Sequence, residues 1–204
     1  MRTKRDDIMR AASEVFLRKG FAAAGVDEIS EVARVSKRTL YKHFKTKDDL
    51  LGAMIARKSE ELSSGLDLTF DDAHTPRKAL DTLARQYLAL VLTEESIDLF
   101  RLVVAESQSF PDFTRSFHEN GVIHLRKSLA LKLAEWTEAG LMEISDPEIA
   151  ADQFLGACVG SLRIRALFPP HPAEFPPSLD KWIDHAVVHF LRGADYRASA
   201  SAEG

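Results

Sequence analysis

The sequence predicts an all-α protein, in which a three-helix helix-turn-helix domain precedes a larger helical domain. Apolar residues recur three and four positions apart along most of the 204 residues, and no stretch shows the alternation of a half-buried strand. The pairs Thr75-Pro76 and Asp146-Pro147 are typical of helix N-termini, where a capping side chain precedes proline. The chain has no internal repeat and no glycine-rich phosphate loop.

Three helices are expected first, over residues 3–19, 26–34 and 37–43. Gly20 should end the first of them. Ser36 can cap the third, whereas the second has only Gly25 at its cap position, which offers no side-chain acceptor. The short turn between the second and third helices is typical of a helix-turn-helix.

Six further helices should follow, over residues 47–64, 75–92, 94–107, 121–139, 146–168 and 178–192, with a short helical turn at 112–118. Thr46 is the expected cap of the first of these. The helix at 146–168 is apolar on nearly every side, so we expect it to be buried on two sides. Residues 65–74 and the proline-rich 169–177 are expected loops, and 194–204 an expected disordered tail.

Charge divides the chain near residue 50, where we also place the boundary between two domains, 1–50 and 51–193. Residues 1–50 hold 12 Lys/Arg and 8 Asp/Glu, a net charge of +4, whereas the rest holds 15 and 23, a net charge of −8. A basic end on an acidic body indicates that only the first domain faces a polyanion. No apolar run could span a membrane and no signal core begins the chain, so we expect a cytoplasmic protein without a membrane partner.

The stretch from Val35 to Lys47 carries five cations, one histidine and no acid. Leu40 and Phe44 lie four positions apart and give its helix an apolar underside, which we assign to the core. The basic side chains fall on the other faces. A short helix held from below, with hydrogen-bond donors above, is suited to reading a DNA groove.

Two parts of the chain carry family motifs. The first spans Ile8 to Leu50 and includes Lys19-Gly20-Phe21, Val26-Asp27-Glu28-Ile29, Val35-Ser36-Lys37, Thr39-Leu40-Tyr41 and His43-Phe44-Lys45-Thr46-Lys47. It resembles the N-terminal pattern of the TetR/AcrR family of bacterial regulators. Residues 100–168 resemble the ligand domain of the AefR-like branch, through Glu106, Phe110-Pro111, Asp146-Pro147-Glu148 and Gln153-Phe154-Leu155-Gly156. The resemblance implies a homodimer, a variable effector pocket in the second domain, and usually repression relieved by a small molecule.

Seven side chains acquire DNA-binding roles through the resemblance: Lys37, Arg38, Thr39, Tyr41, Lys42, His43 and Lys47. The first three resemble the base-reading end of the recognition helix, and their donors and the threonine methyl suit guanine and thymine. The other four resemble phosphate contacts. The alternatives are a solvated basic face and, for His43, a packed or capping role.

Two positions depart from the family pattern. Gly25 stands where the family usually has a threonine or serine cap, and Arg34 stands at the glycine of the turn. If that position needs a positive φ, arginine costs roughly 1 kcal/mol, which a phosphate contact could offset.

The candidate pocket walls of the second domain are Phe100, Val104, Phe113, Phe117, Phe154 and Cys158, for which plain core packing is the alternative. The candidate polar anchors are His118, His124, Arg163 and Arg165, for which surface or ion-paired positions are the alternative. We expect no metal site, because His118 and His124 are six apart, a poor spacing for two ligands on one helix face. We also expect no cofactor and no enzyme, since the chain has no nucleophile elbow, HExxH motif or Walker loop.

We therefore expect a homodimeric regulator of a palindromic double-stranded DNA operator, released by a small-molecule effector that is mostly apolar and neutral or cationic. The helices near 146–168 and 178–192 should form the dimer interface, where Gly156 and Gly160 would allow close approach of a second helix. The alternative is a DNA-binding regulator without a small-molecule effector, constitutive or controlled by a protein partner.

Overall fold

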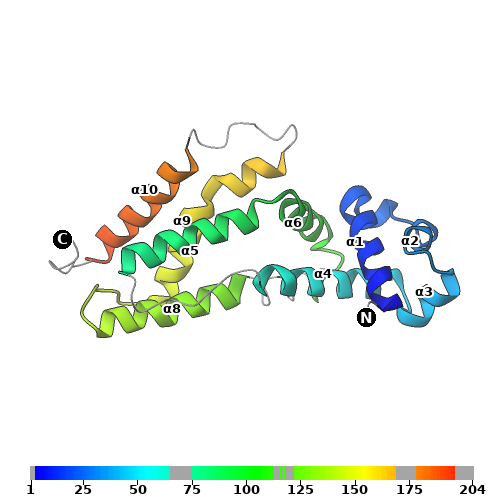
Figure 1. Ribbon diagram of the computed structural model, residues 1–204, viewed down its shortest axis with the longest axis horizontal. Coiled ribbons are helices and arrows are strands. Elements are labelled where there is room, and N and C mark those ends of the chain that lie inside the picture. The colour runs from blue at the N-terminus through cyan, green and yellow to red at the C-terminus, as the bar shows by residue number, and fades with distance from the viewer. Residues whose placement is uncertain are drawn as a thin grey trace. The chain divides into compact units, whose positions relative to one another are not determined.

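The computed structural model describes residues 3–64, 75–112, 115, 117, 122–168 and 178–195. This part of the chain forms nine helices and no strand, which confirms the all-α prediction (Figure 1). The helices are α1 (Lys4–Ala23), α2 (Val26–Val32), α3 (Lys37–His43), α4 (Lys47–Ser64), α5 (Pro76–Val91), α6 (Glu94–Glu106), α8 (Val122–Glu138), α9 (Pro147–Leu167) and α10 (Leu179–Gly193). The expected loops at 65–74 and 169–177, most of the expected turn at 112–118, and the tail beyond 195 lie outside the described residues.

The chain forms two compact units. Unit 1 consists of residues 1–64 and 93–121, and so contains α1 to α4 and α6. Unit 2 consists of residues 65–92 and 122–204, and so contains α5 and α8 to α10. No helix in the described ranges is long and apolar enough to cross a membrane.

The core of unit 1 lies where the apolar faces of its five helices meet. Its members include Ile8, Val15, Phe16, Ile29, Leu40, Phe44, Leu50, Leu51, Met54, Ile55, Leu99 and Leu102. Leu40 and Phe44 are both buried, as the spacing of α3 predicted. Burial of each such side chain stabilises by about 1.5–3 kcal/mol, so α3 is held firmly by its underside.

Local signals set the helix ends in unit 1. Gly20 has φ 75° and ψ 169° and interrupts α1, which confirms the predicted break. Thr46 accepts a hydrogen bond from the Asp49 N–H at 3.0 Å, while the Asp49 carboxylate accepts from the Thr46 N–H at 3.1 Å. This reciprocal capping pair begins α4 at the predicted residue.

Unit 2 contains the four helices α5, α8, α9 and α10. α8 packs along α9, and α10 packs on α5 and α9. The core contains Leu80, Leu83, Tyr87, Leu88, Leu129, Leu133, Phe154, Leu155, Cys158, Leu162, Ile183 and Val187. Phe154 meets Phe190 of α10 edge to face, with ring centroids 5.0 Å apart.

α9 spans the predicted residues but is interrupted at Gly160, where φ is 39° and ψ is −132° (Figure 1). The Trp182 indole N–H donates to the Cys158 carbonyl at 2.7 Å. A Cβ at Gly160 would lie 3.0 Å from Cζ2 of Trp182. This corrects the expected role of Gly160, because its missing side chain makes room for an aromatic ring of the same chain. Gly156 faces open space.

The sequence predicted that α9 is buried on two sides, but within a single chain it is buried on only one. Its buried stripe contains Phe154, Leu155 and Cys158 among others, but Ile149 and Ile164 remain 56% and 53% exposed. One apolar face of α9 is therefore open.

Candidate nucleic-acid interface

The turn between α2 and α3 is closed by two backbone hydrogen bonds. The N–H of Val35 donates to the Ser30 carbonyl and the N–H of Arg34 to the Glu31 carbonyl, both at 3.0 Å. This pattern is a Schellman motif, whose central residue adopts a left-handed conformation. Arg34 is that residue, with φ 53°. This position therefore needs a positive φ. It also corrects the predicted end of the second helix, because α2 ends at Val32 rather than at residue 34 and the left-handed Arg34 lies in the turn.

α3 presents its polar side chains away from the core. Ser36 caps it by accepting from the Thr39 N–H at 3.1 Å, and the two hydroxyl oxygens lie 2.9 Å apart. Thr39 is half-buried. The exposed members of the predicted set are Lys37, Arg38, Tyr41, Lys42 and His43. α3 therefore brings six of the seven candidate DNA-binding residues together on one short helix.

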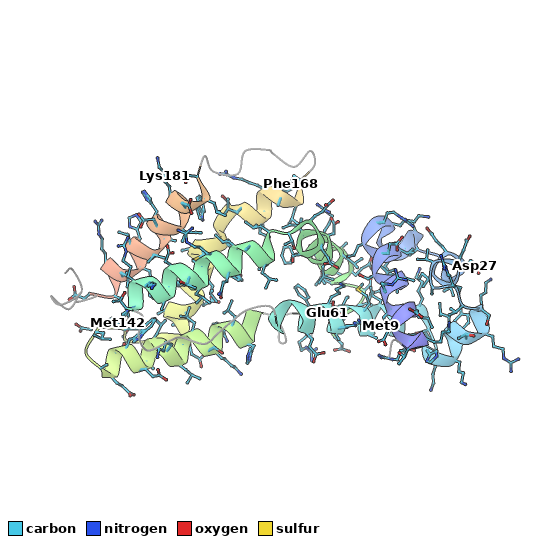
Figure 2. All side chains as sticks on the ribbon, viewed as in Figure 1. Met9, Asp27, Glu61, Met142, Phe168 and Lys181 are labelled. Carbon is cyan, nitrogen blue, oxygen red and sulfur yellow. The ribbon has the colours of Figure 1, made fainter. Side chains whose placement is uncertain are left out.

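Lys37 forms an ion pair with Asp27 of α2, and Figure 2 labels Asp27. Their side chains are 60% and 73% exposed, and an exposed pair of this kind contributes only about 0–1 kcal/mol. A phosphate or a base edge can therefore compete with Asp27 for Lys37 at little cost.

Lys47 has partners inside unit 1. Its Nζ donates to the carbonyls of Phe21 at 2.6 Å and Ala24 at 2.8 Å, and it lies 4.3 Å from the centroid of the Phe21 ring. These carbonyls follow the break at Gly20, where the helix leaves acceptors unused. An ammonium has three donors, so one remains for a phosphate. Sequence reasoning missed this role because the two partners precede Lys47 by 26 and 23 residues.

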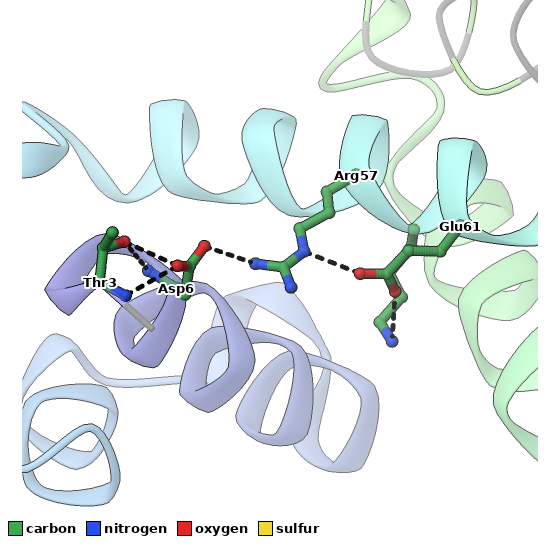
Figure 3. Close-up of polar contacts among 5 residues, drawn as sticks. Thr3, Asp6, Arg57 and Glu61 are labelled. Carbon is green, nitrogen blue, oxygen red and sulfur yellow. Dashed lines mark hydrogen bonds and ion pairs between the residues drawn. The ribbon is translucent and has the colours of Figure 1, made fainter. Parts of the chain in front are cut away.

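A network of ion pairs and hydrogen bonds joins α1, α4 and α6 within unit 1. Figure 3 shows its first part. Its members are Thr3, Asp6, Arg57, Glu61, Lys58 and Glu95. Arg57 bridges the helices, with Nη1 3.3 Å from the Asp6 carboxylate and Nε 2.8 Å from that of Glu61. Backbone and hydroxyl hydrogen bonds from Thr3, aided by Arg57, lower the pKa of Asp6. This network therefore connects the start of α1 to α4, a contact that no sequence pattern had indicated.

The candidate pocket walls are divided between the two units. Phe100, Val104 and Phe117 belong to unit 1, whereas Phe154 and Cys158 are fully buried in the core of unit 2, and Phe113 lies outside the described residues. Neither unit alone brings the set together. Burial raises the pKa of the Cys158 thiol to about 12, so it remains protonated and behaves as a core side chain.

Among the candidate polar anchors, Arg163 lies partly buried in unit 2. It is half-buried, and burial lowers its pKa, although the nearby Tyr87 opposes that shift. Tyr87 is buried, and burial raises the pKa of its phenol. His124 and Arg165 are exposed, and His118 lies outside the described residues. Arg163 and Tyr87 therefore interact electrostatically within unit 2.

Unit 2 also has a hollow of about 680 Å³ between α9 and α10, which we call the α9/α10 hollow. Its lining is mostly apolar and consists of Gln153, Phe154, Ala157, Ser178, Lys181, Trp182, His185, Ala186, His189 and Phe190. Figure 2 labels Lys181 at the start of α10. An open apolar hollow of this size is a place for another molecule or another chain.

Two family models match the chain. The model of the bacterial regulatory proteins of the tetR family matches residues 8–54. The model of the AefR-like transcriptional repressor C-terminal domain matches residues 78–197. Together they cover both the helix-turn-helix and nearly all of unit 2.

Solved structures and sequence relatives agree with these matches. A TetR-family transcriptional regulator from Mesorhizobium loti is 28% identical, with a TM-score of 0.83 over 93% of this chain and 96% of the other. The flavonoid-responsive regulator FrrA is 32% identical, with a TM-score of 0.77 over 93% and 96%. The HTH-type transcriptional regulator YvkB of Bacillus subtilis is 24% identical over 95% of this chain and 98% of its own.

Proposed function

The chain belongs to the TetR family of bacterial regulatory proteins, and from this premise we propose that it is a homodimeric, sequence-specific repressor released by a small, largely apolar effector. Members of this family are DNA-binding transcriptional regulators rather than enzymes. Such a regulator works where the DNA is, so we place it in the cytoplasm.

The observation that carries the proposal is the geometry of α3. Leu40 and Phe44 hold its underside in the core, while its other faces carry exposed cations. In the proposed complex Lys37, Arg38 and Thr39 read base edges in the major groove. Tyr41, Lys42, His43 and the remaining donor of Lys47 contact phosphates.

The proposed dimer forms through α9 and α10. The exposed Ile149, Ile164 and Leu179, the open space at Gly156 and the α9/α10 hollow all support an apolar partner on this face. A two-fold dimer would present two copies of α3 to successive major grooves, about 34–36 Å apart, and would require a palindromic operator.

The proposed effector is a largely apolar aromatic compound. The flavonoid-responsive FrrA, at 32% identity, supports an aromatic compound. The acidic second domain disfavours a phosphorylated or polycarboxylate compound.

The DNA-binding proposal is tested by measuring affinity for selected palindromes as a function of salt concentration. Arg38→Ala should relax preference at one base pair in each half-site, by about 1–3 kcal/mol. Lys42→Ala should weaken all sequences alike and reduce the salt slope by about one for each phosphate contact, or about two per dimer. Lys127→Ala, an exposed cation of α8, is the matched control and should change neither.

Two results would contradict these assignments. An equal, sequence-independent loss from both α3 variants would make Arg38 another phosphate contact. A folded dimer that binds no DNA sequence in preference to another would refute the function.

The effector is tested by thermal shift against flavonoids and other aromatic compounds, followed by operator release. A regulator without a small-molecule effector would show neither a shift nor release.

A further inference from the structure

His185 and His189 lie one turn apart on α10. Positions four apart share a helix face, and the two ring centroids are 5.9 Å apart, with ring planes inclined by 52°. Both side chains are exposed in the single chain, and both line the α9/α10 hollow. The two imidazole rings therefore lie next to each other on the lining of that hollow.

This spacing suits metal chelation. Two histidines at positions i and i+4 can bind one ion from a single helix face, and imidazole nitrogens suit zinc, copper and nickel. The expectation of no metal site considered only His118 and His124, whose spacing of six is poor. The sequence His185-Ala186-Val187-Val188-His189 has the favourable spacing, so sequence reasoning could have found this pair.

One chain supplies only part of such a site. Within the described ranges, no group of three or more His, Cys, Asp or Glu side chains could hold a metal ion. A structural zinc ion takes four ligands in tetrahedral geometry, at about 2.0–2.1 Å from imidazole nitrogen. Two ligands are therefore missing from the single chain.

A second copy of the chain can supply them. The pair lies on the α9/α10 face that the proposed function assigns to the homodimer, and a two-fold axis repeats every residue of such an interface. The apolar Phe154, Trp182 and Phe190 around the hollow would exclude water from an ion held there. Lys181 lines the same hollow, whereas Glu143 and Asp146 line a neighbouring hollow together with His189.

We propose that His185 and His189 are one half of a divalent transition-metal site, and that the same pair of a second copy completes it. The proposal rests on the homodimer of the proposed function. A Zn²⁺ ion bound by the four imidazoles bridges the two α10 helices and strengthens the dimer.

The experiment titrates Zn²⁺ into the full chain, free of metal and of any polyhistidine tag, by calorimetry and by equilibrium dialysis. One ion should bind per two chains. His185→Ala and His189→Ala should each weaken binding by at least about 100-fold, since even outer partners of a metal ligand contribute 10–100-fold. His124→Ala, which removes an exposed histidine of α8, is the control and should bind as the wild type does.

Sedimentation and Co²⁺ absorption give independent measurements. Zn²⁺ should lower the dissociation constant of the wild-type dimer but not that of His189→Ala, and Co²⁺ should show the intense visible bands of a tetrahedral site. A dimer that binds no Zn²⁺ overturns the metal site while leaving the proposed function intact. One ion per chain overturns the shared site. A chain that stays monomeric with and without Zn²⁺ overturns both this site and the proposed dimer.

Discussion

Replacing Gly160 with alanine should destabilise unit 2 far more than the addition of one methyl group suggests. Gly160 has φ 39° and ψ −132°, a backbone conformation that side chains with a Cβ rarely adopt. The new Cβ would also lie 3.0 Å from Cζ2 of Trp182, whose indole N–H donates to the Cys158 carbonyl. The substitution therefore strains the backbone and displaces the ring that satisfies that carbonyl.

The magnitude follows from these two effects. Holding a residue other than glycine in a sparsely populated backbone region costs about 1–3 kcal/mol. Weakening the hydrogen bond from Trp182 costs a further ~0.5–1.5 kcal/mol. We expect a loss of about 2–4 kcal/mol in the free energy of unfolding. Lys127→Ala, at an exposed position of α8 outside the proposed dimer interface, is the control and should change the free energy of unfolding by less than about 0.5 kcal/mol.

The assay is urea unfolding followed by circular dichroism at one fixed chain concentration, since dimerisation makes stability depend on concentration. Trp182→Phe removes the atom that meets the new Cβ. The double variant should therefore lose less than the sum of the single losses, by at least about 0.5 kcal/mol. If Gly160→Ala matched Lys127→Ala within about 0.5 kcal/mol, the role assigned to Gly160 in the break of α9 would be refuted.

Three further predictions concern unit 1. Arg34→Gly should raise the free energy of unfolding by up to about 1 kcal/mol by relieving the positive φ, and a loss in the same urea assay would contradict this. Lys47→Met should cost about 1–3 kcal/mol because two carbonyls lose their donor, whereas the exposed Lys45→Met should change stability by less than about 0.5 kcal/mol. The lowered pKa of Asp6 stabilises the fold above the pKa of the unfolded chain, and this contribution is lost as pH falls through the folded value. The stability difference between wild type and Asp6→Asn should therefore shrink below about pH 4, and a difference independent of pH would contradict the role of Asp6.

The helices of this protein follow from signals within a few residues of each end. The predicted bounds of α3 and α4 match the structure, because Ser36 and Thr46 cap helices that begin at the next residue. Only the family pattern, which has glycine at this turn position, pointed to the positive φ of Arg34, because the helix predicted over residues 26–34 extends past the end of α2 at Val32. The burial of Leu40 and Phe44 followed from their spacing alone.

Tertiary structure decided the features whose partners lie far along the chain. Lys47 reaches carbonyls more than twenty residues earlier, Arg57 joins α4 to Asp6, and Trp182 packs against Gly160 of another helix. Helical periodicity shows which face of a helix is apolar, but it does not say which distant group meets that face. For this reason the sequence alone determined the helices, the basic face of α3 and the family, while only the packed chain showed that α9 breaks at Gly160 and that Lys47 closes the end of α1.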